Sequence, residues 1–174
     1  MFKNVIYKSI VTSIIILAVS LIFFNGLIYA NERVAGEWRV IEEIDPLTDE
    51  IYFLVYNINS EGKVFYIRHQ NHITDLFIHF DDNLVIEEDQ ILADIMYRFD
   101  DGEVYEEFWE LSTDGDSLFY PTFLFNLESF VRPLMQADKI AIGYFPQGKI
   151  RQTTVFNLKG LNRALEPYLD FLGW

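Results

Sequence analysis

The chain contains no cysteine among its 174 residues. This absence excludes disulfide bonds, thiol nucleophiles and cysteine-ligated metal sites. Small domains that work outside the cytoplasm commonly gain stability from disulfides, so a domain of this sequence must be held together by packing. The 16 Phe, 10 Tyr and 3 Trp can supply that packing, because each buried aromatic side chain removes on the order of 150–250 Å² from water.

Positive charge is also scarce in this sequence. There are 13 Lys and Arg against 27 Asp and Glu, which gives a formal net charge of −14 at pH 7. Such a surface repels phosphate backbones and anionic lipid headgroups. We therefore expect no nucleic-acid partner.

A long hydrophobic run occurs at the N-terminus. Residues 10–24 are almost wholly apolar, Lys3 and Lys8 precede them, and Ala30 stands before the polar Asn31. This order predicts an export signal over residues 1–30 that is removed after Ala30. The same segment approaches the roughly 20 residues that cross a bilayer, so an uncleaved inner-membrane anchor is the alternative. Either way, we expect residues 31–174 to act in the periplasm.

Residues 31–174 have a length typical of one domain with its own core. Short runs of β-branched and aromatic residues alternate there with acidic, Asn and Gly clusters, a pattern typical of antiparallel strands joined by tight turns. Strands are predicted near 36–43, 51–57, 63–69, 74–80, 91–99, 104–111, 139–145 and 151–157.

Two segments are predicted to be helical. The first lies within 124–137 and is expected to begin near Ser129, because this start places Pro133 in a first turn whose N–H groups need no partner. The second ends the chain, with Pro167 expected to kink it. Its apolar stripe consists of Leu161, Leu165, Tyr168, Leu169 and Leu172. The predicted fold is therefore mainly β, an antiparallel β-sandwich or curled sheet with one late inserted helix and a C-terminal helix.

Short segments along the domain form a recognisable series. They are Ala35-Gly36-Glu37-Trp38, Asp45-Pro46-Leu47-Thr48-Asp49-Glu50, Tyr66-Ile67-Arg68-His69-Gln70-Asn71, Tyr97-Arg98-Phe99-Asp100, Trp109-Glu110-Leu111-Ser112-Thr113-Asp114, Phe156-Asn157-Leu158-Lys159-Gly160-Leu161 and the terminal Gly173-Trp174. In this order and spacing they resemble the TagO/VasI-like accessory proteins of type VI secretion systems, over nearly all of residues 31–174.

The resemblance implies an envelope protein attached to a contractile injection machine, with protein partners, no catalytic residue and no cofactor. In that family a cysteine typically stands where this chain has His69, and another where it has Leu172. We expect these two side chains to approach each other. A disulfide closing so long a loop would constrain the unfolded chain by about 4–5 kcal/mol. The residues that carry the pattern, for which we expect structural roles, are Gly36, Trp38, Arg68, Arg98, Asp100, Trp109, Ser112, Thr113, Asp114, Gly160, Leu161 and Trp174.

Candidate metal ligands are present but are predicted to lie apart. Strand alternation places His69 and His79 on different strands and His72 in a turn, whereas zinc requires three or four convergent ligands. The acidic clusters 45–50 and 114–116 lack the spacing of a calcium loop and are expected to be solvated turns. We therefore predict no metal site.

Glu106, Glu107 and Glu110 surround Trp109 and are the candidate contact residues for a protein partner. Paired carboxylates also perform glycoside hydrolysis. Alternation places Glu107 with Trp109 on one face and the other two glutamates opposite, so we interpret the three as the solvent side of a half-buried strand. Ser112-Thr113-Asp114 has no histidine at a recognisable spacing, so the sequence gives no argument for a hydrolytic triad. Arg98 with Asp100 is expected to form a structural ion pair or part of a polar lattice.

Three functions remain open on these observations. We favour a non-catalytic periplasmic accessory or scaffold protein of a type VI secretion system. The alternative is an exported acidic inhibitor or immunity-type binder that blocks a basic envelope hydrolase by charge complementarity. A carboxylate hydrolase of the cell wall comes last, because no motif supports it.

Overall fold

The computed structural model describes residues 31–84 and 91–174. The predicted export signal, residues 1–30, lies outside the described residues. Within the described ranges, no helix combines the length and the apolar character needed to span a bilayer.

The strands form one ten-stranded antiparallel sheet in the order β1-β2-β3-β4-β5-β8-β7-β6-β9-β10. The prediction of a mainly β curled sheet with a late inserted helix and a C-terminal helix is confirmed. The strands are β1 (Asn31–Ala35), β2 (Trp38–Ile44), β3 (Ile51–Ile58), β4 (Val64–Gln70), β5 (Ile73–His79), β6 (Leu92–Phe99), β7 (Tyr105–Leu111), β8 (Ser117–Phe119), β9 (Lys139–Tyr144) and β10 (Gln152–Asn157). The helices are α2 (Leu127–Gln136), α3 (Leu161–Leu165) and α4 (Leu169–Leu172), with a 3₁₀ turn, η1 (Glu166–Tyr168), between the last two.

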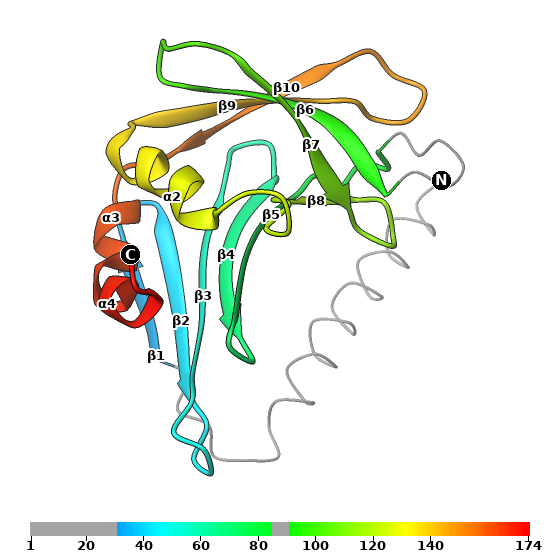
Figure 1. The fold of residues 1–174 in the computed structure, drawn as a ribbon. Coiled ribbons are helices and arrows are strands. Elements are labelled where there is room, and N and C mark those ends of the chain that lie inside the picture. Colours follow the sequence, from blue (N-terminus) through cyan, green and yellow to red (C-terminus); the bar gives the residue numbers. More distant parts are fainter. Residues whose placement is uncertain (1–30, 85–90) are drawn as a thin grey trace, which may run out of the picture.

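The sheet curls into two layers. Strands β1 to β5 form one half, and β6, β7, β9 and β10 run across them as the other half (Figure 1). The three-residue strand β8 joins the halves by pairing with both β5 and β7. At the far end, Asn57 and Asn59 donate side-chain hydrogen bonds to Asn157 and Val155 of β10. The last strand is thereby tied back to the end of β3, and the curl is nearly closed.

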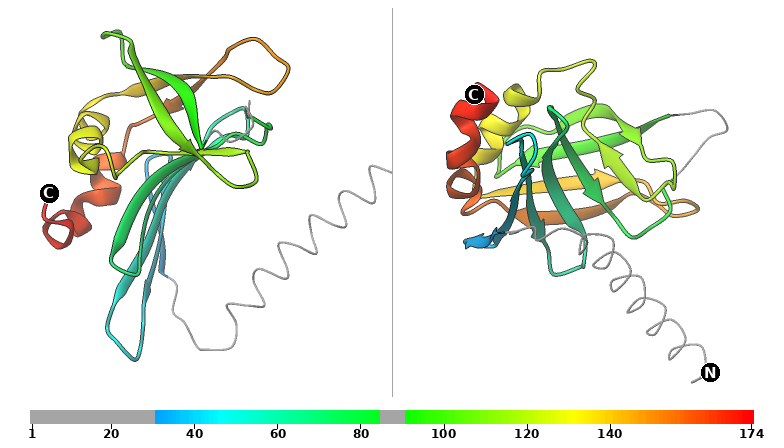
Figure 2. Two further views of the ribbon diagram at one scale, coloured as in Figure 1. Left: turned by 45° about the vertical axis from the view of Figure 1, so that its right-hand side comes forward. Right: turned by 90° about the horizontal axis from the view of Figure 1, so that it is seen from below.

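The core lies between the two layers. Trp38, Phe65, Trp109 and Phe156 are fully buried there. Their rings pack edge to face, as in Trp38 on Phe65 at 5.8 Å and Phe65 on Phe156 at 5.5 Å. The helices gather at one end of the layers (Figure 2), where Phe130 of α2 packs on Trp109 at 5.4 Å. Aromatic packing therefore provides the cohesion expected of a chain without disulfides.

Helix α2 begins earlier than the sequence suggested. It starts at Leu127, because the side chain of Asn126 accepts a hydrogen bond from the Glu128 N–H at 2.9 Å and caps the first turn. Pro133 therefore lies inside the helix, not in its first turn. Because proline has no N–H, Pro133 cannot donate the usual helical hydrogen bond to the Ser129 carbonyl. Both residues are exposed to solvent, so water can bond to this carbonyl instead. The expected start near Ser129 was wrong for this reason.

The C-terminal stripe packs as predicted, but on a broken helix. Leu161, Leu165 and Tyr168 are buried, and Leu169 and Leu172 pack against the core. Pro167 lies in the 3₁₀ turn that separates α3 from α4, so the kink is confirmed. The chain then turns back at Gly173, whose φ is +73°, and the N–H of Trp174 donates to the Leu169 carbonyl.

Candidate functional site

The three candidate glutamates of β7 have different surroundings. Glu107 faces the core, where its carboxylate accepts hydrogen bonds from the Tyr97 hydroxyl at 2.7 Å and the Trp109 indole N–H at 3.2 Å. Burial and the bond to Glu107 raise the pKa of Tyr97 far above its ordinary value. Glu106 and Glu110 lie on the opposite face. The expectation of three solvated carboxylates is therefore wrong for Glu107, which a buried phenol and indole need as an acceptor.

The three histidines lie in three environments. His69 stacks on Phe53 at 5.4 Å and shares a hydrogen bond with Thr74, whereas His79 shares one with Ser117. His72, in the turn between β4 and β5, pairs with Glu50 at 2.8 Å. Burial lowers the pKa of His69 and the nearby His72 adds to the effect. Across 31–84 and 91–174, the structure shows no group of three or more His, Asp or Glu side chains placed to hold a metal ion.

The expected ion pair between Arg98 and Asp100 is not formed. Asp100 follows β6 at a positive φ of 48°, and its Oδ1 accepts hydrogen bonds from the backbone N–H groups of Asp138 and Lys139, both at 3.0 Å. The carboxylate of Asp100 thus bonds to the backbone at the start of β9. The prediction assumed that Arg98 and Asp100 lie on one face of the same strand, but β6 ends at Phe99. Arg98 is exposed on β6.

Most residues of the motif series are buried in the core or form hydrogen bonds within the fold. Trp38, Trp109 and Leu161 are fully buried, and Trp174 packs against the core. Arg68 forms a two-pronged pair with Asp75 on the neighbouring strand. In the turn before β8, Oγ of Ser112 accepts a hydrogen bond from the Ser117 N–H at 3.0 Å. A separate hydrogen bond between the Ser112 side chain and Asp114 lowers the pKa of Asp114. Thr113 and Asp114 are exposed.

Gly36 and Gly160 contact each other, although 124 positions separate them. Gly36 forms the β1–β2 turn and Gly160 precedes α3, both with positive φ. A Cβ atom on Gly36 would lie 2.5 Å from the Lys159 carbonyl oxygen, and one on Gly160 would lie 2.2 Å from that of Ala35. Only glycine allows the two backbones to approach this closely.

The acidic turns are internally bonded. Asp45 Oδ1 accepts the N–H groups of Leu47 and Thr48 at 2.7 and 3.2 Å, and Asp116 accepts the hydroxyl of Ser117 at 2.7 Å. These contacts are those of side chains that shape their own turns.

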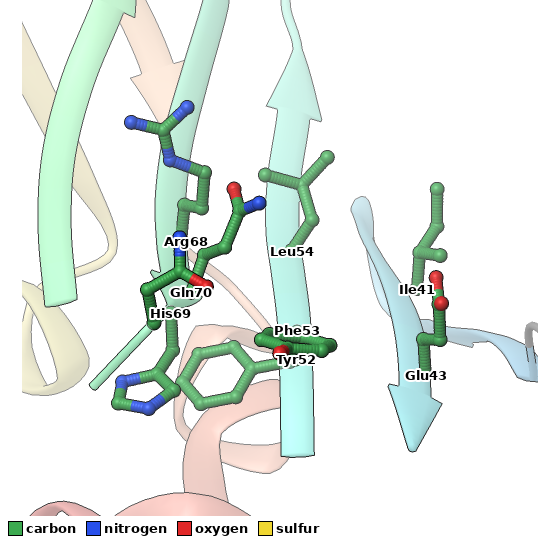
Figure 3. A pocket seen from close by; sticks show the side chains of 9 residues that line it. Ile41, Glu43, Tyr52, Phe53, Leu54, Arg68, His69 and Gln70 are labelled. Carbon is green, nitrogen blue, oxygen red and sulfur yellow. The ribbon is translucent and has the colours of Figure 1, made fainter. Parts of the chain in front are cut away.

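An open depression of about 350 Å³ lies over β2, β3 and β4 (Figure 3). Its rim carries Arg68 and Glu43, but Arg68 is already paired with Asp75 and lies over the Phe77 ring at 5.1 Å. The guanidinium of Arg68 is therefore already engaged by a carboxylate at this depression. The lining of the depression includes Ile41, Glu43, Tyr52, Leu54, Arg68 and Gln70.

An aromatic ladder crosses the outer face of the sheet. Tyr56, Tyr66, Phe77 and Phe119 are register partners on β3, β4, β5 and β8. The Tyr66–Phe77 and Phe77–Phe119 rings stack at 4.6 and 4.7 Å. The faces of these stacked rings therefore cover one another in part. The next partner of Phe119 is Glu110, so the ladder ends at an acidic residue.

A run of exposed apolar side chains lies in the segment between β8 and α2. Phe123, Leu124 and Phe125 are 61%, 55% and 45% exposed, although Phe125 also touches Tyr120 at 6.3 Å between ring centres. Sequence reasoning missed this segment as a site, because the same residues could equally have begun the amphipathic helix. Consecutive exposed residues of this size are unusual on a surface that has no binding role.

Comparison with known proteins identifies a similar fold. No family model and no curated protein matches the sequence. The crystal structure of invasion associated protein B from Bartonella henselae is similar, with a TM-score of 0.57 and 12% sequence identity, over 83% of this chain and 98% of that chain. At this identity the likeness shows a shared fold.

Proposed function

We propose that this protein is a non-catalytic accessory or scaffold component of a type VI secretion system that works in the periplasm. The secretion role rests on the motif series between Gly36 and Trp174. Residues of the series that lie far apart in the sequence meet in the fold, as Gly36 and Gly160 do. This contact supports interpreting the series as the signature of one fold.

A non-catalytic role is supported by how the candidate acids are used. Glu107, the carboxylate beside Trp109, is bonded to a phenol and an indole. Asp100 holds backbone N–H groups, and the acids of the turns hold their own turns. Each of these groups has a structural partner where catalysis would need it free to meet a substrate.

The observation that carries the proposal of protein binding is the exposed run of Phe123, Leu124 and Phe125. Protein interfaces concentrate aromatic and large apolar side chains in a buried centre surrounded by polar groups. The chain as a whole carries a formal net charge of −14 at pH 7. The partner surface should therefore combine an apolar hollow with a basic rim.

The test is made in the strain that carries the gene. We expect its deletion to reduce release of the tube subunit into the medium, and the wild-type gene to restore it. A variant with Phe123→Ser, Leu124→Ser and Phe125→Ser should accumulate normally but fail to restore release. The control variant has Val34→Ser, Leu47→Ser and Ile150→Ser, which removes three apolar side chains elsewhere that are even more exposed than those of the run.

Two results would contradict this proposal. Unchanged tube release after deletion would remove the secretion role, and full restoration by the Phe123–Phe125 variant would place the contact elsewhere. N-terminal sequencing of the protein from a periplasmic extract tests the location and should begin at Asn31. An intact Met1 in washed membranes would instead show an anchored protein.

The second candidate function is inhibition of an envelope hydrolase. It is favoured by the net charge of −14 and by the exposure of Glu106 on the outer face of β7, with Glu110 half-buried beside it. A basic muramidase should then lose activity on titration with the protein, with an association rate that falls as salt rises. An unchanged rate of cell-wall hydrolysis at an excess of the protein would exclude this function for the muramidase tested.

A further inference from the structure

A second hollow, of about 200 Å³, lies on the outer face of the other half of the sheet, over β6, β9 and β10. Pairing places Met96, Gly143 and Thr153 in one row across these strands, and Arg98 beside Ala141 in another. Small residues on the middle strand leave the space, and longer side chains on the flanking strands form its walls.

Arg151 extends across the middle strand into this hollow. A Cβ atom on Gly143 would lie 3.4 Å from Cδ of Arg151 and 3.5 Å from Cβ of Met96. The Arg151 stem therefore lies over Gly143, and its Nη1 reaches Sδ of Met96 at 3.0 Å. This contact brings the guanidinium of Arg151 to β6, the strand that carries Arg98. Both arginines line the same hollow.

Four arginines of the described residues form no ion pair with a carboxylate: Arg33, which donates to backbone carbonyls instead, Arg163, and the two arginines of the hollow. Of these four, Arg98 and Arg151 alone line the hollow. Over residues 31–84 and 91–174, no Asp or Glu forms an ion pair with Arg98 or Arg151. Asp100, the nearest acid in sequence to Arg98, is bonded to the backbone of β9 instead. The basic residues that do form ion pairs with Asp or Glu are Arg39, Lys63, Arg68, Arg132, Lys139, Lys149 and Lys159.

Two arginines at one hollow are unexpected in a chain with 27 acidic residues, and no Asp or Glu is among the described residues that line this hollow. Glu106 is the register partner of Met96 on β7, so an acid lies one strand away, yet Arg98 is not paired with it. Like charges held together repel each other, and the repulsion is relieved when an anion binds between them. A guanidinium offers a planar fork of N–H donors that fits the oxygens of phosphate or carboxylate.

We propose that the hollow between Arg98 and Arg151 binds a small oxyanion group, a phosphate or a carboxylate. The Thr153 hydroxyl lines the same hollow and can donate a further hydrogen bond. A space of this size also suits one such group with its waters. This site lies on different strands from the Phe123–Phe125 run and is independent of the proposed secretion role.

The test is calorimetric titration of the full chain with sodium phosphate and, separately, with sodium succinate, at constant ionic strength set by chloride. We expect at least one of them to bind, and Arg98→Gln and Arg151→Gln each to weaken that binding about tenfold, the usual effect of losing one charge-assisted contact. The tighter of the two anions identifies the class of ligand.

The matched control is Arg163→Gln on α3. This side chain is exposed and also forms no ion pair with a described carboxylate, but it does not line the hollow. The variant makes the same change in net charge and should bind as the wild type does. The proposal is overturned if neither anion binds the wild type, if Arg98→Gln and Arg151→Gln bind normally, or if Arg163→Gln is weakened as much as they are.

Discussion

The contact between Gly36 and Gly160 makes a quantitative prediction for the variant Gly36→Ala. The new Cβ would lie 2.5 Å from the Lys159 carbonyl oxygen, closer than the 3.0 Å below which real Cβ contacts essentially never fall. The oxygen belongs to the backbone and no rotamer change can move it. The β1–β2 turn and the start of α3 must therefore separate.

The cost has two parts. Alanine at a φ of +67° costs about 1 kcal/mol, the usual penalty of a left-handed residue after allowing for the stiffer unfolded chain. Separating the backbones also disturbs the Arg33 side chain, which donates to the Ala164 carbonyl at 2.6 Å, and the buried Leu161 and Trp38. These losses add about 2 kcal/mol. We expect a total near 3 kcal/mol, or a fall of roughly 10 °C in the midpoint of thermal unfolding.

The matched control is Gly148→Ala. Gly148 has a φ of +70°, but a Cβ there meets nothing within 4 Å, so this variant carries the backbone penalty alone and should lose about 1 kcal/mol. Thermal and urea unfolding of both variants measure the difference. Equal losses in Gly36→Ala and Gly148→Ala would refute the close approach of the two backbones.

Three further predictions concern the glutamates, acid and the last helix. Glu107→Ala should lower the free energy of unfolding by about 1–3 kcal/mol, because it leaves the Tyr97 hydroxyl and Trp109 indole without an acceptor, whereas Glu106→Ala with Glu110→Ala should change the midpoint by little. Burial lowers the pKa of His69 and hydrogen bonds from Lys149 and Lys63 lower that of Asp82, so the unfolded chain binds more protons than the folded one at each group. Stability should therefore fall as the pH drops below about 6.5 and again below about 4, and His69→Phe and Asp82→Asn should each remove one of these steps from a series of unfolding curves. His69→Cys with Leu172→Cys should form a disulfide without reductant, because Phe171 already touches the His69 ring at 5.0 Å between ring centres; two free thiols in the folded protein would show that the alignment with the secretion family is wrong at one of these positions.

The strands could be predicted because alternation of apolar and polar residues is a local signal. All eight predicted strands are present, and no end differs from its predicted position by more than two residues. The sequence missed β1 and β8 for different reasons. β1 pairs with β2 through a two-residue turn at Gly36. The sequence prediction instead placed Gly36 at the start of a single strand. β8 has three residues, too few for a pattern, and its conformation depends on β5 and β7 on either side.

The face of the sheet on which a candidate residue lies was easier to predict than the side chains that surround it. Alternation correctly placed Glu107 beside Trp109 on the inner face of β7, but the hydrogen bond from Tyr97 comes from the next strand and leaves no trace in the local sequence. The pairing of Arg98 with Asp100 failed because β6 ends at Phe99 and the chain turns. The hollow between Arg98 and Arg151 joins positions 53 residues apart and depends on which strands pair.

The end of the last helix shows how this fold can dispense with the disulfide that the resemblance would place between positions 69 and 172. An aromatic stack occupies this region: Tyr168 lies on Phe53 at 4.1 Å, Phe53 on His69 at 5.4 Å, and His69 meets Phe171 at 5.0 Å. The Tyr168 hydroxyl also donates to Glu42 on β2 at 2.6 Å.

Each aromatic pair adds about 0.5–1.5 kcal/mol beyond the area it buries. Three pairs together contribute about 1.5–4.5 kcal/mol, and the upper end of this range approaches the roughly 4–5 kcal/mol expected of the bridge. The disulfide and the aromatic stack stabilise the fold in different ways. A disulfide restricts the unfolded chain, whereas the stack acts only in the folded state and depends on His69 remaining neutral, since burial disfavours its charged form. The attachment of the last helix should accordingly be insensitive to reductants and sensitive to acid.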